Sequence, residues 1–290
     1  MKLKMLAIGL GCAAAAAASI SAGGASASTS STCSGTVNLL AAGSLSTVLQ
    51  NKIDPAFHRA TGCTVTLTTH GSSALATSIK NGEVVGDVFL SAPPKVTQTL
   101  VGKSNGGWVS WYEEFAKSPQ VLAYNPGSKF KYGLLHEAWY KVITKNGFIV
   151  ERTDPATDPG GVLAEDTLRA AAKKFPNYRR ALNRIAASSS SSVNGDEDAE
   201  QASIQTGQAD AAFMYESDAI SQDSPWVNLS GVPTQYGKYT VTILKNAPDG
   251  PAAKAFVKFI LSSQGAKLLK SEKFHVISPA EKFGKVPSGI

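Results

Sequence analysis

The sequence has few of the residues and motifs on which most enzymes depend. Three cysteines and four histidines occur among its 290 residues. No two cysteines have the Cys-x-x-Cys spacing of a zinc site, and no histidine belongs to a His-Glu-x-x-His motif. None of the four histidines is paired with a candidate nucleophile. We therefore do not expect the protein to be an enzyme, and an exported enzyme is the less favoured alternative.

Long apolar runs are also scarce, and the clearest one lies at the start of the chain. Lys2 and Lys4 precede an Ala-rich segment from Met5 to Ile20, and Ala25-Ser26-Ala27 follows it. This order of charge, apolar run and small residues is typical of a secretory signal peptide. We expect residues 1–27 to be removed near Ala27 and residues 28–35 to form a polar leader. The mature chain is then expected to be soluble and extracytoplasmic (secreted or periplasmic).

Removal of the signal peptide would leave two cysteines, Cys33 and Cys63. An even pair in an exported protein tends to form a disulfide, because the compartment is oxidising. Each cysteine precedes a strand-like segment, Thr36–Ala42 or Thr64–Thr69, so a bridge would join the starts of two neighbouring strands. The alternative is a pair of free buried thiols.

The formal net charge of +6 excludes little by itself, because the basic residues are spread along the chain. They cluster only at Arg169–Arg184 and Lys254–Lys273, and both clusters have the pattern of solvated helix faces. A nucleic-acid-binding protein would more often show a concentrated basic patch with interleaved aromatic residues. We expect no nucleic-acid partner, whereas a mildly basic chain favours attraction of a small anion.

Strand-like and helix-like segments alternate along most of the remaining sequence. The strand-like segments are Val37–Ala41, Val65–Thr69, Asp87–Ala92, Gln120–Tyr124, Phe148–Thr153, Ala211–Met214 and Gln235–Lys245. The helix-like segments are Leu45–Gly62, Ser73–Asn81, Pro94–Val101, Leu134–Asn146, Gly161–Phe175, Tyr178–Ala187, Ala199–Gly207 and Gly250–Lys273. This alternation predicts an α/β protein with mostly parallel strands and right-handed crossovers. About 260 residues suit two lobes, which we assign to residues 36–117 with 234–290 (lobe 1) and to residues 118–233 (lobe 2).

Four short segments combine small or polar residues with the start of a helix. They are Ala42–Ser46, Gly71–Leu75, Thr153–Gly161 and Phe213–Ala219. Three of the four place a small residue between a strand and a helix, where free backbone N–H groups and the positive end of the helix dipole attract an anion. Helix starts that converge in this way would form a receptor for a small, doubly charged oxyanion.

The order and spacing of these segments resemble the periplasmic molybdate/tungstate-binding proteins that supply ABC importers. The strand Asp87–Ala92, with the sequence Asp-Val-Phe-Leu-Ser-Ala, also resembles a signature of that family, and the resemblance extends from Val37 to Pro279. It implies a two-lobed type II periplasmic-binding-protein fold, with mixed sheets flanked by helices and a ligand cleft between the lobes. It also implies a monomer that needs no cofactor and delivers its ligand to an ABC permease.

The resemblance also assigns roles to individual residues. Ser44 and Ser72 match two serines that hydrogen-bond the oxyanion from the first lobe. Gly160 matches a position that donates a backbone N–H from the second lobe, and Tyr215 matches a tyrosine whose hydroxyl points into the site.

Two acidic residues depart from the hydrogen-bonding pocket of the bacterial proteins. Asp158 and Glu197 stand where those proteins have apolar residues, which resembles the archaeal-type branch, where two carboxylates join the coordination shell of molybdenum or tungsten. Because Asp196, Asp198 and Glu200 crowd the same stretch, the second carboxylate could also be one of these neighbours. The sequence does not decide between molybdate and tungstate, which have similar size and charge.

Each of these positions also has a purely structural explanation. Ser44 and Ser72 could be helix N-caps, and Asp158-Pro159-Gly160 could be a turn followed by a helix start. Glu197 could be a solvated acid that complements a helix dipole, and Tyr215 could be a core residue. Another small anion, such as phosphate, sulfate, chromate or an organic acid, is the alternative ligand.

Overall fold

The computed structural model describes residues 33–188, 192–193 and 197–290. The expected signal peptide, and most of the polar leader, lie outside the described residues. Residues Thr32–Ile290 form one compact unit. Within the described residues, no helix is both long enough and apolar enough to cross a membrane.

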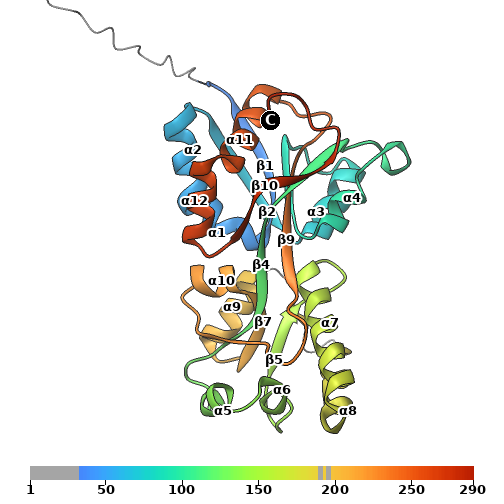
Figure 1. Ribbon diagram of the computed structural model, residues 1–290, viewed down its shortest axis with the longest axis vertical. Coiled ribbons are helices and arrows are strands. Elements are labelled where there is room, and N and C mark those ends of the chain that lie inside the picture. The colour runs from blue at the N-terminus through green and yellow to red at the C-terminus, as the bar shows by residue number, and fades with distance from the viewer. Residues whose placement is uncertain (1–32, 189–191, 194–196) are drawn as a thin grey trace, which may run out of the picture. The chain divides into compact units, whose positions relative to one another are not determined.

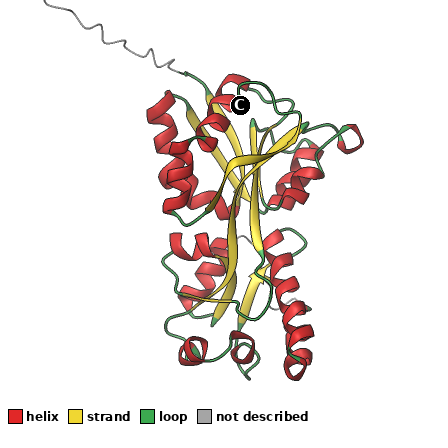
Figure 2. Cartoon of the chain, in the orientation of Figure 1, coloured by secondary structure: helices red, strands yellow, loops and turns green. Residues whose placement is uncertain are grey.

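A parallel three-stranded sheet forms the beginning of the folded chain (Figures 1 and 2). Strand β1 lies between β2 and β3 and pairs with both in parallel. The elements of this part are β1 (Thr36–Ala42), η1 (Gly43–Leu45), α1 (Ser46–Val48), η2 (Leu49–Ile53), α2 (Asp54–Thr61), β2 (Thr64–His70), α3 (Ser72–Asn81), β3 (Val88–Ser91), α4 (Pro94–Gln98) and η3 (Lys103–Asn105). The βαβ alternation read from the sequence is thus confirmed in this region.

The middle of the chain builds a second group of strands and helices around β7. Strand β7 pairs in parallel with β5, and β5 pairs in parallel with β6. The elements here are α5 (Lys131–His136), α6 (Trp139–Val142), β5 (Val150–Thr153), α7 (Pro159–Lys174), η4 (Pro176–Tyr178), α8 (Arg179–Ala186), β6 (Ser192–Val193), α9 (Glu197–Thr206), β7 (Ala211–Tyr215), α10 (Glu216–Ser221) and β8 (Trp226–Asn228).

Two long strands, β4 (Trp111–Tyr124) and β9 (Tyr236–Ile243), connect these two groups. Strand β4 pairs with β9 over Glu113–Pro119 and then with β7 over Gln120–Tyr124, in both cases antiparallel. Strand β9 also pairs with β3, so one continuous sheet has the order β2-β1-β3-β9-β4-β7-β5-β6. Figure 1 shows β4 and β9 passing from the upper part of the fold into the lower part.

The hydrophobic cores separate along the same division. The largest core combines residues between Val37 and Ala116 with residues between Tyr239 and Phe274, including a Phe57–Phe256 edge-to-face pair. A second core lies wholly between Leu122 and Leu229. Each part of the fold therefore buries its own apolar surface.

Several elements differ from the sequence expectations. The helix expected over Gly250–Lys273 is two helices, α11 (Gly250–Leu261) and α12 (Ser263–Ser271), because Ser262 is extended and its hydroxyl accepts the N–H of Gly265. The helix expected over Leu134–Asn146 is interrupted because Glu137 and Ala138 have extended backbones. Strand β4 is longer than expected, and β10 (His275–Gly284), which pairs with β4, was not expected from the sequence.

Cys33 and Cys63 form the expected disulfide. It lies at the starts of β1 and β2, where the backbone N–H of Cys33 also donates to the carbonyl of Thr61. Gly62 ends helix α2 in a left-handed conformation, with φ of 83°, and so turns the chain into β2. The bridge therefore joins the start of β1 to the start of β2.

We predict that the Cys33→Ala/Cys63→Ala variant is less stable by about 3–4 kcal/mol, because the bridge closes a loop of 30 residues in the unfolded chain. Denaturant titration of oxidised wild type, reduced wild type and the variant measures this difference. Wild type that unfolds at the same midpoint with and without reductant would contradict the prediction.

Candidate functional site

Strand ends and helix starts from both parts of the fold lie against one another. A Cβ atom added to Gly71, which precedes α3, would lie 2.7 Å from the carbonyl oxygen of Thr157 and 3.3 Å from Oδ2 of Asp158. Two further elements of the first part contact helices of the second part: η1 contacts α9, and α1 contacts α10. The structure thus brings three of the four sequence-predicted segments, those at η1, α3 and α7, to a common boundary. The fourth segment is the β7–α10 junction, and its helix α10 contacts α1.

Ser72 occupies the first turn of α3 and is 1% exposed. Its side chain does not cap the helix, and the residue at the cap position is Gly71. The Ser72 hydroxyl instead accepts a hydrogen bond from the backbone N–H of Ala92, at 3.0 Å. A hydroxyl has one donor and two acceptor positions, so this contact leaves the Ser72 proton able to donate.

Ser44 lies inside η1, directly after β1, and is buried. The residue preceding η1 is Ala42 in the cap position, and no side chain caps this turn. The N-cap explanation is therefore wrong for both serines. Their polar side chains are buried at helix starts for a reason other than helix capping.

Asp158 does cap a helix, as the structural explanation for this segment expects. Its Oδ1 accepts the backbone N–H of Gly160 at 2.6 Å and the hydroxyl of Thr153 at 3.0 Å. The N–H of Gly160, which the family resemblance directs at a ligand, is thus bonded to Asp158 in this structure. A ligand could accept that N–H only after the Asp158 carboxylate moved.

A narrow internal gap, too small to admit a water molecule, lies behind this helix start, and we call it the cavity. Its walls are Gln120, Thr153, Gly160, Glu200, Phe213, Met214 and Tyr215. The Tyr215 hydroxyl lies 3.6 Å from where a Cβ of Gly160 would be, so these two predicted residues are neighbours. The Gln120 amide donates to the Gly160 carbonyl and accepts from the Thr167 hydroxyl, which fixes the first turns of α7.

The position of the Tyr215 ring depends on a glycine in β9. A Cβ added to Gly237 would lie 2.6 Å from Cε1 of Tyr215. The ring also packs edge-on against Tyr239, with centroids 6.2 Å apart. Tyr215 therefore lies in the core, as its structural explanation expects, while its hydroxyl reaches the cavity.

Glu200 is the acidic residue that the structure places in the cavity wall. It is fully buried, and neither carboxyl oxygen has a hydrogen bond of normal geometry. Burial raises the pKa of Glu200 well above its usual value, and the nearby carboxylates of Asp158, Asp218 and Glu151 raise it further. A contact with the Thr153 backbone lowers the pKa and so offsets part of this rise. A buried acid whose carboxyl oxygens lack hydrogen bonds of normal geometry is costly to the fold, and groups of this kind concentrate at functional sites.

From the sequence, Glu200 is expected only as a neighbour of Glu197. Glu197 is the first residue of α9, and its side chain lies outside the described residues, so its role stays a prediction. Glu197 and Glu200 are three residues apart, and residues with this spacing share a face of a helix. This spacing was the signal in the sequence that Glu200 could also face the site. A further buried hydroxyl, that of Ser217 on α10, has no hydrogen-bond partner in the described part of the chain.

Two other kinds of site find no support. Within the described residues, no three His, Cys, Asp or Glu side chains are arranged to hold a metal ion. The sequence Gly102-Lys103-Ser104-Asn105-Gly106 has the Gly-x-Ser-x-Gly spacing of hydrolases. Ser104 lies in the exposed turn η3, whereas a nucleophile elbow requires a strand-to-helix turn.

Comparison with known proteins identifies the fold and the family. A family model described as bacterial extracellular solute-binding protein matches residues 37–274. An uncharacterised solute-binding protein of Halobacterium salinarum is 26% identical over 260 residues, which cover 79% of this chain and 81% of that protein. The molybdate/tungstate-binding protein of Pyrococcus abyssi is 23% identical over 232 residues, covering 63% of this chain and 67% of that protein.

Solved structures of similar fold include proteins named for different anions. The periplasmic molybdate-binding protein of Azotobacter vinelandii superposes with a TM-score of 0.63 and 18% identity, covering 83% of this chain and all of that one. The sulfate-binding protein of Mycobacterium tuberculosis gives 0.64 and 17%, covering 84% and 88%. These likenesses confirm the type II periplasmic-binding-protein fold expected from the sequence.

We predict that Glu200→Gln stabilises the ligand-free protein at neutral pH. Because its pKa is raised in the folded state, wild type loses stability as pH rises above the ordinary Glu value and until it passes the folded pKa. The loss is about 1.4 kcal/mol per pH unit in that window, and glutamine, which does not ionise, avoids it.

Thermal unfolding of both proteins between pH 4 and pH 8 measures this effect. The exposed Glu281→Gln serves as the control and should follow wild type across the range. A Glu200→Gln protein that is less stable than wild type at pH 8 would show that the carboxyl group has a stabilising partner.

Proposed function

The chain belongs to the family of bacterial extracellular solute-binding proteins, whose members supply ABC importers, and we propose that its ligand is molybdate or tungstate. The observation that carries this proposal is the presence of buried carboxyl groups, Asp158 and Glu200, among helix starts and buried hydroxyls. Helix starts and hydroxyls suit an oxyanion. The carboxyl groups restrict which oxyanion it is.

Electrostatics explains this restriction. A carboxylate about 4 Å from one charge of an anion is repelled by about 4 kcal/mol at an effective dielectric constant near 20. Sulfate and phosphate gain no bond to the central atom in return, because sulfur and phosphorus do not take further oxygen ligands. Molybdenum and tungsten do accept them, and carboxylate oxygen is a suitable ligand for such hard centres. The repulsion is then replaced by a metal–oxygen bond.

In this proposal the two parts of the fold contribute different groups. Ser44 and Ser72 donate hydroxyl hydrogen bonds from the first part, and Ser72 is oriented for this by Ala92. Tyr215 and the Gly160 N–H act from the second part, the latter once Asp158 turns from its cap to the metal. The second carboxylate comes from α9, either Glu197 as the resemblance implies or Glu200, which lines the cavity.

Another small anion remains the alternative, since the sulfate-binding protein of Mycobacterium tuberculosis shares the fold. A protonated phosphate could donate a hydrogen bond to one carboxylate. A fully deprotonated sulfate has no proton to donate, so the two acids would only repel it. The carboxylates therefore favour molybdate and tungstate over sulfate.

Isothermal titration calorimetry of the chain without residues 1–27 tests the proposal, with molybdate, tungstate, sulfate and phosphate as separate titrants. We expect one-to-one binding of molybdate and tungstate and little or no binding of sulfate. Tight binding of sulfate or phosphate with none of molybdate would overturn the ligand assignment and leave the family assignment intact.

We predict that Asp158→Asn weakens molybdate binding by at least tenfold. Asparagine keeps the oxygen that accepts from Gly160 and Thr153 but is a poor ligand for the metal. If Asp158 were only a cap, the substitution would remove repulsion with the dianion and affinity would rise or stay level.

Parallel titrations of Glu197→Gln and Glu200→Gln identify the second carboxylate, as the variant with the larger loss. X-ray absorption of the bound molybdenum checks the same point. A six-coordinate spectrum supports two carboxylate ligands, and a four-coordinate spectrum with short oxo distances alone eliminates them.

We predict that Gly71→Ala weakens binding and also destabilises the arrangement of the two parts seen here, because the added methyl group has no room in it. The added methyl group would meet the Thr157 carbonyl across the boundary at 2.7 Å, so it opposes closure of the two parts on a ligand. Gly250→Ala is the matched control, because a Cβ there meets nothing within 4 Å. Equal affinities of the two variants for molybdate would show that closure does not require this contact.

A further inference from the structure

The hairpin of helices α7 and α8 has an unusual charge distribution. Between Thr167 and Ser188 the sequence contains six basic residues and no Asp or Glu. All six are exposed, and we call them the basic face: Arg169, Lys173, Lys174, Arg179, Arg180 and Arg184. Without these six of its 28 Lys and Arg residues, the chain keeps 22, equal to its 22 Asp and Glu residues. The six charges of the basic face thus equal the formal net charge of +6 of the whole sequence.

Few of these charges are neutralised by neighbours. Arg169 pairs with Glu165 at 3.2 Å, and Nε of Arg179 donates to the Ala172 carbonyl, which fastens α8 to α7. Lys173, Arg180 and Arg184 form no ion pair with any residue that the structure describes. Positive charges left unpaired on a rigid hairpin give a lasting positive potential at the surface.

Part of the basic face surrounds a shallow hollow of about 220 Å³, lined by Arg169, Ala172, Lys173, Arg179 and Asn183. Every polar side chain in this lining carries hydrogen-bond donors, and three of them are cationic. Such a hollow suits a single phosphate group, which Arg and Lys bind through charge-assisted hydrogen bonds.

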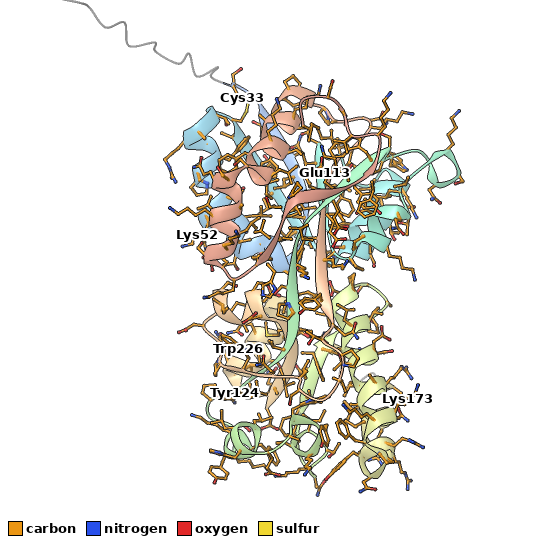
Figure 3. All side chains as sticks on the ribbon, viewed as in Figure 1. Cys33, Lys52, Glu113, Tyr124, Lys173 and Trp226 are labelled. Carbon is orange, nitrogen blue, oxygen red and sulfur yellow. A yellow bond between two sulfur atoms is a disulfide. The ribbon has the colours of Figure 1, made fainter. Side chains whose placement is uncertain are left out.

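The basic face is separate from the candidate site. In Figure 1, α8 lies at the lower end of the second part of the fold, away from β1, β2 and β3. Figure 3 shows Lys173 at the outer side of the same hairpin, directed away from the strands. A partner bound there would leave the boundary between η1, α3 and α7 accessible.

The residue types indicate what kind of partner fits. Protein partners are usually bound through a central cluster of exposed aromatic or apolar residues. None of the large exposed hydrophobic residues of the described chain lies between residues 167 and 188. A spread of separate cationic groups instead matches a surface of many single negative charges, such as an anionic lipid leaflet.

We propose that the basic face of α7 and α8 binds the anionic phospholipid headgroups of the membrane beside which an extracellular solute-binding protein works. This inference depends on the family and the hairpin, and not on the identity of the small ligand. A membrane contact of this kind would keep the protein near a membrane-embedded importer without engaging the cleft.

Vesicle co-sedimentation of the chain without residues 1–27 tests this proposal. Vesicles of phosphatidylcholine alone are compared with vesicles containing 30% phosphatidylglycerol, at low and at high salt. Each Lys or Arg near an anionic leaflet contributes roughly fivefold to partitioning. We expect binding only to the anionic vesicles, weakened by salt, and at least a tenfold loss in the variant Lys173→Glu/Arg180→Glu/Arg184→Glu.

The matched control reverses three exposed lysines of α11 and α12, in Lys254→Glu/Lys267→Glu/Lys270→Glu. It changes the net charge equally and should bind nearly as well as wild type. Equal losses of vesicle binding in both variants would show that net charge alone is responsible. Wild type that does not bind anionic vesicles would refute the membrane contact. Circular dichroism of both variants checks that they remain folded.

Discussion

The pairing of β4 with β9 is the constraint on which the rest of the structure depends. Strand β9 pairs with β3 of the first part and with β4 over Glu113–Pro119, and β4 alone goes on to pair with the described strands of the second part. Because β4 continues into pairing with β7, the end of β7 and its Tyr215 are placed relative to β1 and β3 through a single sheet. Gly237, in the same stretch of β9, provides the space for the Tyr215 ring. Small changes in this ladder would therefore move the second half of the site as a unit.

Buried acids at the boundary impose a cost that the fold does not recover by itself. Asp158 is satisfied by Gly160 and Thr153, whereas Glu200 is fully buried without a hydrogen bond of normal geometry and faces other carboxylates. A sequence under selection for stability alone would replace Glu200 with an uncharged residue. Its presence is easier to explain if a ligand of the right chemistry relieves the strain, and the same repulsion then acts against ligands that do not.

The sequence predicts the fold well where the signal is local. The βαβ pattern up to Ser91, the end of α2 at Gly62 and the Cys33–Cys63 bridge all follow from periodicity, from glycine or from cysteine pairing. It does less well where tertiary contacts decide. The break at Ser262 depends on one side-chain hydrogen bond to Gly265, and β10 is a largely exposed strand that exists because β4 offers it an edge.

The candidate site shows the same division between local and tertiary information. Motifs placed Ser44, Ser72, Asp158 and Tyr215 at strand ends and helix starts, but they did not show that neither serine caps its helix or that Gly160 is already bonded to Asp158. Those facts depend on side-chain geometry. Glu200 was harder still, since four acids crowd residues 196–200 and the sequence alone does not show that Glu200 lines the cavity. A motif therefore cannot identify residues whose role depends on the direction of the side chain. At this boundary the direction of the acidic side chains also determines whether a ligand meets negative charge.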